Sequence, residues 1–192
     1  MSDPPHPRDK DKVRQKIVRS AARLFNHHGF AAVSIDQIMA GAGLTRGGFY
    51  AYFGSKSELY AEAIAHFIGR RKENRDAAAS FREDAAKTLR QYLANKPSEK
   101  GDSACPLIGL TADFARNDTA IRKAHEDLLK LIVETFERGI ASESGRHRQI
   151  ALALSSLCVG GLMLARMVDD PALADELRAA TMMVATHLGG WE

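Results

Sequence analysis

The stretch SIDQIMAGAGLTRGGFYAYF, residues 34–53, constrains the fold of this chain most, because it predicts two short helices joined by a tight turn. The first helix is expected to begin at Ser34, since Gln37 stands three positions later, as in a capping box. Gly43 supplies a residue that readily adopts a positive φ between helices. Thr45 is then expected to cap the second helix. The pattern therefore predicts a helix-turn-helix.

The second predicted helix has two faces of different character. Phe49 and Phe53, four positions apart, are expected to anchor it to a core. The opposite face carries small, cationic and hydroxyl-bearing residues: Thr45, Arg46, Gly47, Gly48, Tyr50 and Tyr52. Each glycine inside a helix costs about 1 kcal/mol relative to alanine. A helix that lies in a nucleic-acid groove has a use for them, because its backbone approaches closely while arginine reaches base edges and hydroxyls contact phosphates. The alternative, a flexible helix start, is disfavoured by the helix-turn-helix frame.

These motifs, at this spacing, resemble the DNA-binding domain of TetR-family transcriptional repressors. The matching positions are Leu24-Phe25, Gly29-Phe30, Ser34, the run from Ile38 to Phe53, Ser55-Lys56 and Leu59. Met39 departs from the family pattern, which usually has alanine there, and is expected to widen the spacing between the two helices slightly. The resemblance covers about the first third of the chain. It implies an all-α protein with a three-helix helix-turn-helix domain at residues 10–54 and a helical regulatory and dimerisation domain at 55–192.

Charge is unevenly distributed along the chain. Residues 1–75 hold 13 Lys/Arg against 7 Asp/Glu, a net charge of +6, whereas residues 76–192 hold 14 against 17, a net charge of −3. A basic head ahead of an acidic body favours a nucleic-acid-binding head. Basic residues near the start are candidates for phosphate contacts, with simple solvation as the alternative: Arg8, Lys10, Lys12, Arg14, Lys16 and Arg19. The Pro-rich segment at residues 1–9 is expected to be disordered.

Apolar periodicity and capping residues predict helices over the rest of the chain. The expected ranges are 10–28, 55–71, 76–95, 104–116, 118–141, 146–168 and 171–187. The helix at 146–168 is apolar nearly all round, so it must be covered on most sides. Together with 171–188 it is expected to meet the same two helices of a second copy in a four-helix bundle, where the resemblance places the family's dimer interface. A monomer core is the alternative.

Cys105 and a set of large side chains are the candidates for sensing an effector. Pro106 favours a helix start there, and a helix amino-terminus lowers a thiol pKa. Some TetR-family members that resemble this arrangement sense oxidants or electrophiles, whereas the alternative is an inert buried cysteine. The residues expected to line a cavity, each equally suited to plain core packing, are Phe81, Tyr92, Phe114, Met163, Met167 and Cys158.

The function predicted from these features is a homodimeric transcriptional repressor that binds a palindromic operator in double-stranded DNA. Arg46 is expected to read base edges, Thr45, Gly47 and Gly48 to allow close approach, and Ser34, Tyr50, Tyr52 and Lys56 to contact phosphates. A small molecule or modification of Cys105 is expected to release the DNA.

Two other functions compete with this one. A Cys105-dependent enzyme needs a base within reach, and no motif ties His66 or His125 to that cysteine. The other is a helical module that binds a protein partner. Neither a cofactor nor a metal site is expected. The polar start and a longest uncharged apolar run of 16 residues, 150–165, predict neither a signal peptide nor a membrane span. Two cysteines suit the cytoplasm.

Overall fold

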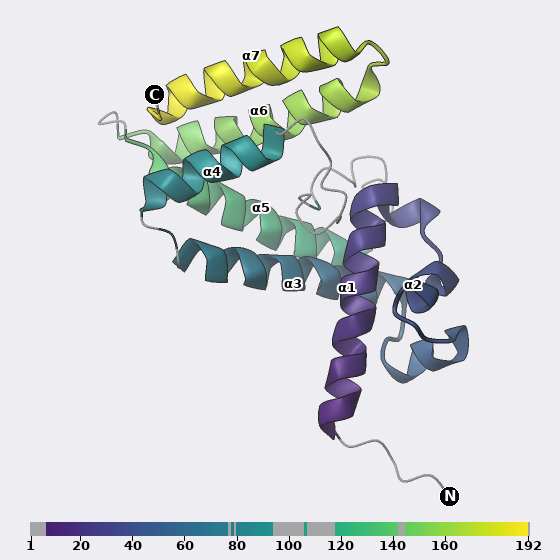
Figure 1. Cartoon of the computed structure of the whole chain (residues 1–192). Helices are drawn as coiled ribbons and strands as arrows, with labels where there is room; N and C mark the ends of the chain where they lie inside the picture. Colours follow the sequence, from purple (N-terminus) through teal and green to yellow (C-terminus); the bar gives the residue numbers. More distant parts are fainter. Residues whose placement is uncertain are drawn as a thin grey trace, which may run out of the picture.

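The structure is a computed structural model that describes residues 7–76, 78, 80–93, 106, 118–141 and 145–191. Within these residues every regular element is helical, which confirms the all-α prediction. The elements are α1 (Pro7–Ala32), α2 (Ile35–Gly41), the short 3-10 helix η1 (Arg46–Ala51), α3 (Lys56–Asp76), α4 (Phe81–Leu93), α5 (Thr119–Gly139), α6 (His147–Met167) and α7 (Pro171–Gly189). The first three form a head at one end of the molecule, and α4 to α7 form a body connected to it through α3 (Figure 1).

Helix α1 begins at Pro7, three residues before the predicted start, so residues 7–9 are helical and not part of a disordered tail. Proline is favoured in a first helical turn, where its missing N–H has no partner to lose. The helix is interrupted at Gly29, whose φ of 78° and ψ of 165° are not helical, as predicted for a glycine that ends a helix. The buried side of α1 carries Ile17, Ala21 and Phe25 and faces α3.

The predicted capping box and turn are both present in the head. The Gln37 N–H donates to Ser34 Oγ at 3.2 Å, and the Ser34 N–H donates to Gln37 Oε1 at 2.8 Å. Gly43 has a φ of 73°. The second helix differs from the prediction, because it is a 3-10 helix and Thr45 makes no side-chain capping bond. Its backbone bonds span three residues, as from the Tyr52 N–H to the Phe49 carbonyl at 2.9 Å, and adjacent glycines favour so short a piece over an α-helix.

Helix α3 runs to Asp76, five residues beyond the predicted end at residue 71. The charged run at 72–75 does not break it, because lysine, glutamate and arginine are good helix formers. At its start, Ser55 Oγ accepts from the Glu58 N–H at 3.0 Å, while the Glu58 carboxylate accepts from the Gly54 N–H at 2.7 Å. The predicted capping box is therefore present, except that the Glu58 carboxylate accepts from the N–H of Gly54 instead of that of Ser55.

The helices of the body begin and end within two residues of their predicted limits, with one exception. Helix α4 begins at Phe81 instead of residue 76. Asp118 accepts from two backbone N–H groups at the start of α5, and Asp170 accepts from the Ala172 N–H at 2.9 Å at the start of α7. A Cβ at Gly161 of α6 would lie 2.3 Å from Thr181 Oγ1 of α7, so this close helix contact requires glycine. The predicted helix at 104–116 lies outside the described residues except for Pro106.

Helix α6 packs against α4, α5 and α7 in the centre of the body (Figure 1). Among the helices that the structure describes, it alone is long and apolar enough to cross a membrane by length and composition, with a mean hydropathy of 1.8. Core helices of soluble proteins pass the same test. In this fold α6 serves as the central helix of the body.

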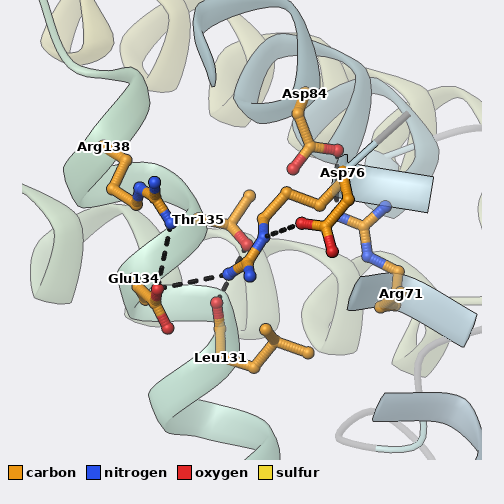
Figure 2. A network of polar contacts seen from close by, with 8 residues as sticks. Arg71, Asp76, Asp84, Leu131, Glu134, Thr135 and Arg138 are labelled. Carbon is orange, nitrogen blue, oxygen red and sulfur yellow. Dashed lines mark hydrogen bonds and ion pairs between the residues drawn. The ribbon is translucent and has the colours of Figure 1, made fainter. Parts of the chain in front are cut away.

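A network of charged side chains ties the end of α3 to the body (Figure 2). Arg71 donates to Thr88 Oγ1 at 2.6 Å and lies 3.4 Å from Asp84 Oδ1, both on α4. The Arg71 and Asp84 side chains are only 14% and 4% exposed, and removing one member of so buried a pair would leave an uncompensated charge. Arg75 bonds Glu134 of α5 at 3.2 Å. The carboxyl-terminal half of α3 is therefore fastened to both α4 and α5.

Candidate nucleic-acid interface

The face of η1 predicted to bind DNA is exposed, and its anchoring face is buried. Phe49 and Phe53 are 0% and 1% exposed, with ring centroids 5.8 Å apart. The opposite side presents Thr45, Arg46 and Gly47 to solvent, together with Tyr50, which is 66% exposed. The buried face of η1 thus carries Phe49, and its exposed face carries the residues predicted to contact DNA.

A Cβ could be added at either glycine of η1 without a close contact. A Cβ at Gly48 would come 3.7 Å from Cε of Met39, an ordinary contact with the buried residue that departs from the family pattern. A Cβ at Gly47 would meet no atom within 4 Å. Packing within the chain therefore does not require glycine at position 47, which is consistent with an outer surface kept flat for close approach.

Arg46 pairs with Asp36, a residue that sequence reasoning did not single out. Arg46 Nη1 lies 3.0 Å from Asp36 Oδ2, and the two side chains are 67% and 55% exposed. Exposed ion pairs of this kind contribute about 1 kcal/mol or less. Arg46 is therefore held close to α2 in the free chain by an interaction weak enough to be exchanged for a base.

Ser34, Tyr52 and Lys56, predicted to contact phosphates, also have roles inside the head. The Ser34 hydroxyl caps α2 but remains exposed. Tyr52 is half-buried. Lys56, at the first position of α3, places its ammonium 4.4 Å from the centroid of the Phe30 ring, in a cation–π contact. The start of α3 still offers free N–H groups and the positive end of a helix dipole.

Arg14, one of the candidates for phosphate contact, is engaged inside the head. Its guanidinium forms a bidentate pair with Glu62 of α3, with Nε 2.9 Å from Oε1, and also donates to the Tyr52 carbonyl. It lies 4.3 Å from the centroid of the Phe53 ring. The hydrogen bond with Glu62 raises the pKa of Arg14 above its ordinary value, against a smaller opposing effect of burial. Arg14 is a clamp between α1, η1 and α3.

Comparison with known proteins agrees with this geometry. A sequence profile described as "Bacterial regulatory proteins, tetR family" matches residues 17–63, which span the head and the start of α3. Residues 17–63 thus form a TetR-family head. The predicted resemblance to TetR-family transcriptional regulators is confirmed, and it supports DNA binding by this head.

Two relatives from Bacillus subtilis strain 168 show how far the likeness extends. The uncharacterized HTH-type transcriptional regulator YerO is 30% identical over 90 residues, which are 47% of this chain and 27% of that protein. The uncharacterized HTH-type transcriptional regulator YxaF is 25% identical over 82% of this chain and 86% of its own length. Among solved structures, reduced E. coli NemR superposes with a TM-score of 0.74 at 18% identity, over 92% of this chain and 97% of that chain, which shows a shared fold.

A buried Tyr60–His125 contact joins the connecting helix α3 to the body. Tyr60 of α3 is 2% exposed, and its hydroxyl lies 3.3 Å from His125 Nε2 of α5. His125 Nδ1 lies 2.8 Å from the Ile121 carbonyl, which only accepts, so Nδ1 carries the proton and Nε2 accepts from Tyr60. Burial lowers the pKa of His125 below its ordinary value. Both ring nitrogens of His125 are therefore engaged in hydrogen bonds at this junction.

Tyr60 also contacts two aromatic rings of α1. Its ring centroid lies 4.9 Å from that of Phe25 and 5.2 Å from that of Phe30, both edge to face. The neighbours of Tyr60 thus come from α1 and α5, at least 30 residues away on either side. Sequence periodicity carried no signal for this junction.

The described residues that were predicted to line an effector cavity differ in exposure. Phe81 is 46% exposed beneath the Arg138 guanidinium, and Met167, the last residue of α6, is 74% exposed. Tyr92 is buried and Met163 half-buried. Phe81 and Met167 lie at helix ends, and neither is enclosed in the single chain. Cys105 and Phe114 lie outside the described residues.

Cys158 is an unreactive core residue. It is 1% exposed on α6, and burial raises the pKa of its thiol to about 12. At neutral pH it holds almost no thiolate, the form that reacts with oxidants and electrophiles. Cys158 therefore supplies an internal control for any reaction at Cys105.

A pocket lies between α1 and α3, and its described lining includes none of the residues predicted to line a cavity. Its wall on α1 is made by Arg19, Ala22, Phe25 and Asn26. Its wall on α3 is made by Tyr60, Ala63, Ile64, His66, Phe67 and Arg70. Pro106 completes the lining. The pocket sits where the head meets the connecting helix.

Proposed function

We propose that this chain is a homodimeric cytoplasmic repressor that binds a palindromic operator and is released from it by a small-molecule or thiol-reactive effector. The observation that carries this proposal is the exposed Thr45–Tyr50 surface, flattened by two glycines and held in place by buried Phe49 and Phe53. Two such heads, one helical turn apart, suit two half-sites of one operator.

Arg46 is the residue proposed to read sequence. It is exposed on η1, and arginine most often recognises the O6 and N7 atoms of guanine in the major groove. Gly47 and Gly48 bring the backbone close, together with Thr45. Ser34, Tyr50, Tyr52 and Lys56 are proposed to contact phosphates around it, which would set the position of η1 in the groove.

The dimer is proposed to form through α6 and α7. Both helices keep large apolar side chains exposed in the single chain: Leu152, Leu164 and Met167 on α6, and Leu173, Met183, Val184 and Leu188 on α7. So many exposed apolar side chains on two adjacent helices are typical of an interaction surface. A second copy would bury the same residues on both sides.

Release from DNA is proposed to pass through α3. Arg14–Glu62 and Tyr60 join α3 to the head, whereas Arg71 and Arg75 join it to the body. A body that changes shape on binding an effector would therefore carry the heads with it. For this to be allostery, the effector must bind the DNA-free shape more tightly than the DNA-bound shape.

The proposal is tested by titrating the protein against the duplex that flanks its own gene and against an unrelated duplex, at two salt concentrations. Tight, sequence-selective and salt-dependent binding supports a regulator. A protein-interaction module would show no selectivity, and its weak duplex binding would not distinguish the two sequences. An enzyme acting through Cys105 would need a turnover that Cys105→Ser abolishes while DNA binding is absent.

Arg46→Ala is expected to weaken operator binding by about 1–3 kcal/mol and to relax the preference at one base pair. The substitution removes an exposed side chain, so the fold should not change. Titration against operators altered at single base pairs measures the effect, and Arg122→Ala, an exposed residue of α5, is the matched control. Lys56→Ala, by contrast, should weaken all duplexes alike and flatten the salt dependence. An Arg46→Ala protein with unchanged base preference would refute the assignment.

Cys105 is proposed as the reactive thiol. It precedes Pro106, which lines the pocket between α1 and α3, and the solved structure of NemR is that of its reduced form. N-ethylmaleimide is expected to release the wild-type protein and Cys158→Ser from the operator but to leave Cys105→Ser bound. Fluorescence anisotropy of a labelled duplex follows the release. Equal release of wild type and Cys105→Ser would place the reaction elsewhere.

A further inference from the structure

We propose that Asp36 is a positioning residue that makes Arg46 selective for its base pair. The Asp36 carboxylate holds the guanidinium at the exposed side of η1 and cancels its charge. Arg46 then strengthens binding to the correct base pair and adds little to the binding of other duplexes. The inference rests on the proposed function, since it assigns a supporting partner to the residue proposed to read sequence.

The Arg46–Asp36 contact joins the two helices of the helix-turn-helix on their exposed side. Nη1 of Arg46 donates to Oδ2 of Asp36 at 3.0 Å, across ten positions of the chain. The two side chains are 67% and 55% exposed, so the pair is open to a duplex that approaches η1. The contact uses one of the five N–H groups of the guanidinium. The others remain available for the O6 and N7 acceptors of a guanine.

Capping of α2 does not account for the direction of the Asp36 side chain. Asp36 stands in the first turn of the helix, where an acidic residue also interacts favourably with the helix dipole. The capping bonds at this turn, however, are made by Ser34 and Gln37, whose backbone N–H groups each donate to the side chain of the other. The carboxylate of Asp36 is therefore free to reach η1.

The neighbours of Arg46 on η1 give its side chain little support. Gly47 and Gly48 have no side chains, and Thr45 makes no side-chain capping bond. An unsupported arginine samples many rotamers, and this freedom is lost when the side chain binds a base. Asp36 removes part of that freedom before DNA is met, which leaves Arg46 preorganised.

The pair also removes a positive charge from the binding surface. Phosphates attract a free guanidinium in any sequence, and each neutralised phosphate adds to binding that does not depend on sequence. Arg46 paired with Asp36 has no net charge, and the carboxylate itself repels phosphates. A repulsive element of this kind disfavours unrelated duplexes more than the operator, where the contact with guanine compensates.

Asp36→Asn tests this role, because it keeps the size of the side chain and removes its charge. The variant is expected to bind an unrelated duplex about threefold to tenfold more tightly, with a salt slope steeper by about 1. The ratio of operator affinity to unrelated affinity should fall at least about fivefold, with relaxed preference at the base pair that Arg46 reads. Anisotropy titrations against operators altered at single base pairs measure these changes. Glu73→Gln, exposed near the far end of α3, removes the same charge and should leave the ratio unchanged.

The Arg46→Ala background separates positioning from other roles of Asp36. If Asp36 acts through Arg46, Asp36→Asn should cause no further change of base preference in that background. A change that persists there would mean that Asp36 reads a base itself, and equal weakening of both duplexes would mean that it only supports α2. Either result, or an unchanged affinity ratio in Asp36→Asn, overturns the positioning role. The proposed function would still stand if Arg46→Ala alone relaxed the base preference.

Discussion

Phe49→Ala is expected to lower the free energy of unfolding by about 3–5 kcal/mol, the usual cost of removing a fully buried phenylalanine. The ring is 0% exposed and packs against Phe53 and Tyr50, with centroids 5.8 and 5.2 Å away. A small domain has a free energy of unfolding of only about 5–15 kcal/mol, so the substitution should remove a large part of the stability of the head. Denaturant unfolding followed by circular dichroism measures the loss.

Tyr50→Ala is the matched control for this prediction, because it removes the neighbouring aromatic residue from the exposed side of η1. Tyr50 is 66% exposed, so its loss should change stability by about 0.5 kcal/mol or less while weakening DNA binding. If Phe49→Ala unfolds at the same denaturant concentration as wild type, η1 is not anchored as the structure shows.

Combined Leu164→Glu and Met183→Glu substitutions are expected to convert the proposed dimer into monomers and to weaken operator binding by a factor of about 10²–10⁴. The two side chains are 53% and 68% exposed on α6 and α7, so charge is tolerated in the single chain but not in a buried interface. Operator affinity falls because the second head no longer binds as part of the same molecule. Light scattering gives the mass, and anisotropy gives the affinity.

Leu129→Glu provides the control for the dimer prediction. Leu129 is an apolar residue of α5 with 41% exposure, and it lies on neither of the two proposed interface helices. It should leave both mass and operator affinity unchanged. A double variant on α6 and α7 that still has the mass of a dimer would show that the interface lies on another surface.

Local signals predicted the head well because they act over a few residues. The capping box at Ser34, the positive φ of Gly43 and the burial of Phe49 and Phe53 all follow from neighbours within four positions. The same reasoning misjudged Thr45, since a side-chain cap was inferred from residue type while the following glycines favoured a 3-10 turn. It also misjudged the end of α3, where strong helix formers continued the helix.

Helical periodicity identified the apolar face of each helix. It did not show which of these faces are buried by other helices of the same chain. Phe81 and Met167 were assigned to a cavity, and both are exposed in the single chain. The apolar character of α6 and α7 was visible in the sequence. Only the folded chain showed which part of it remains exposed for a partner, including Leu164 and Met183.

The sequence by itself determined most of the described helices, the turn and the resemblance of the head to the TetR family, because capping, glycine conformation and apolar spacing are properties of short segments. Tertiary structure alone decided how the parts are joined. The Arg14–Glu62 pair joins residues 48 positions apart, and the Tyr60–His125 contact joins residues 65 positions apart. Neither contact can be predicted from the sequence pattern around its residues. The pocket between α1 and α3 arises in the same way, since its opposing walls become neighbours only when the two helices pack.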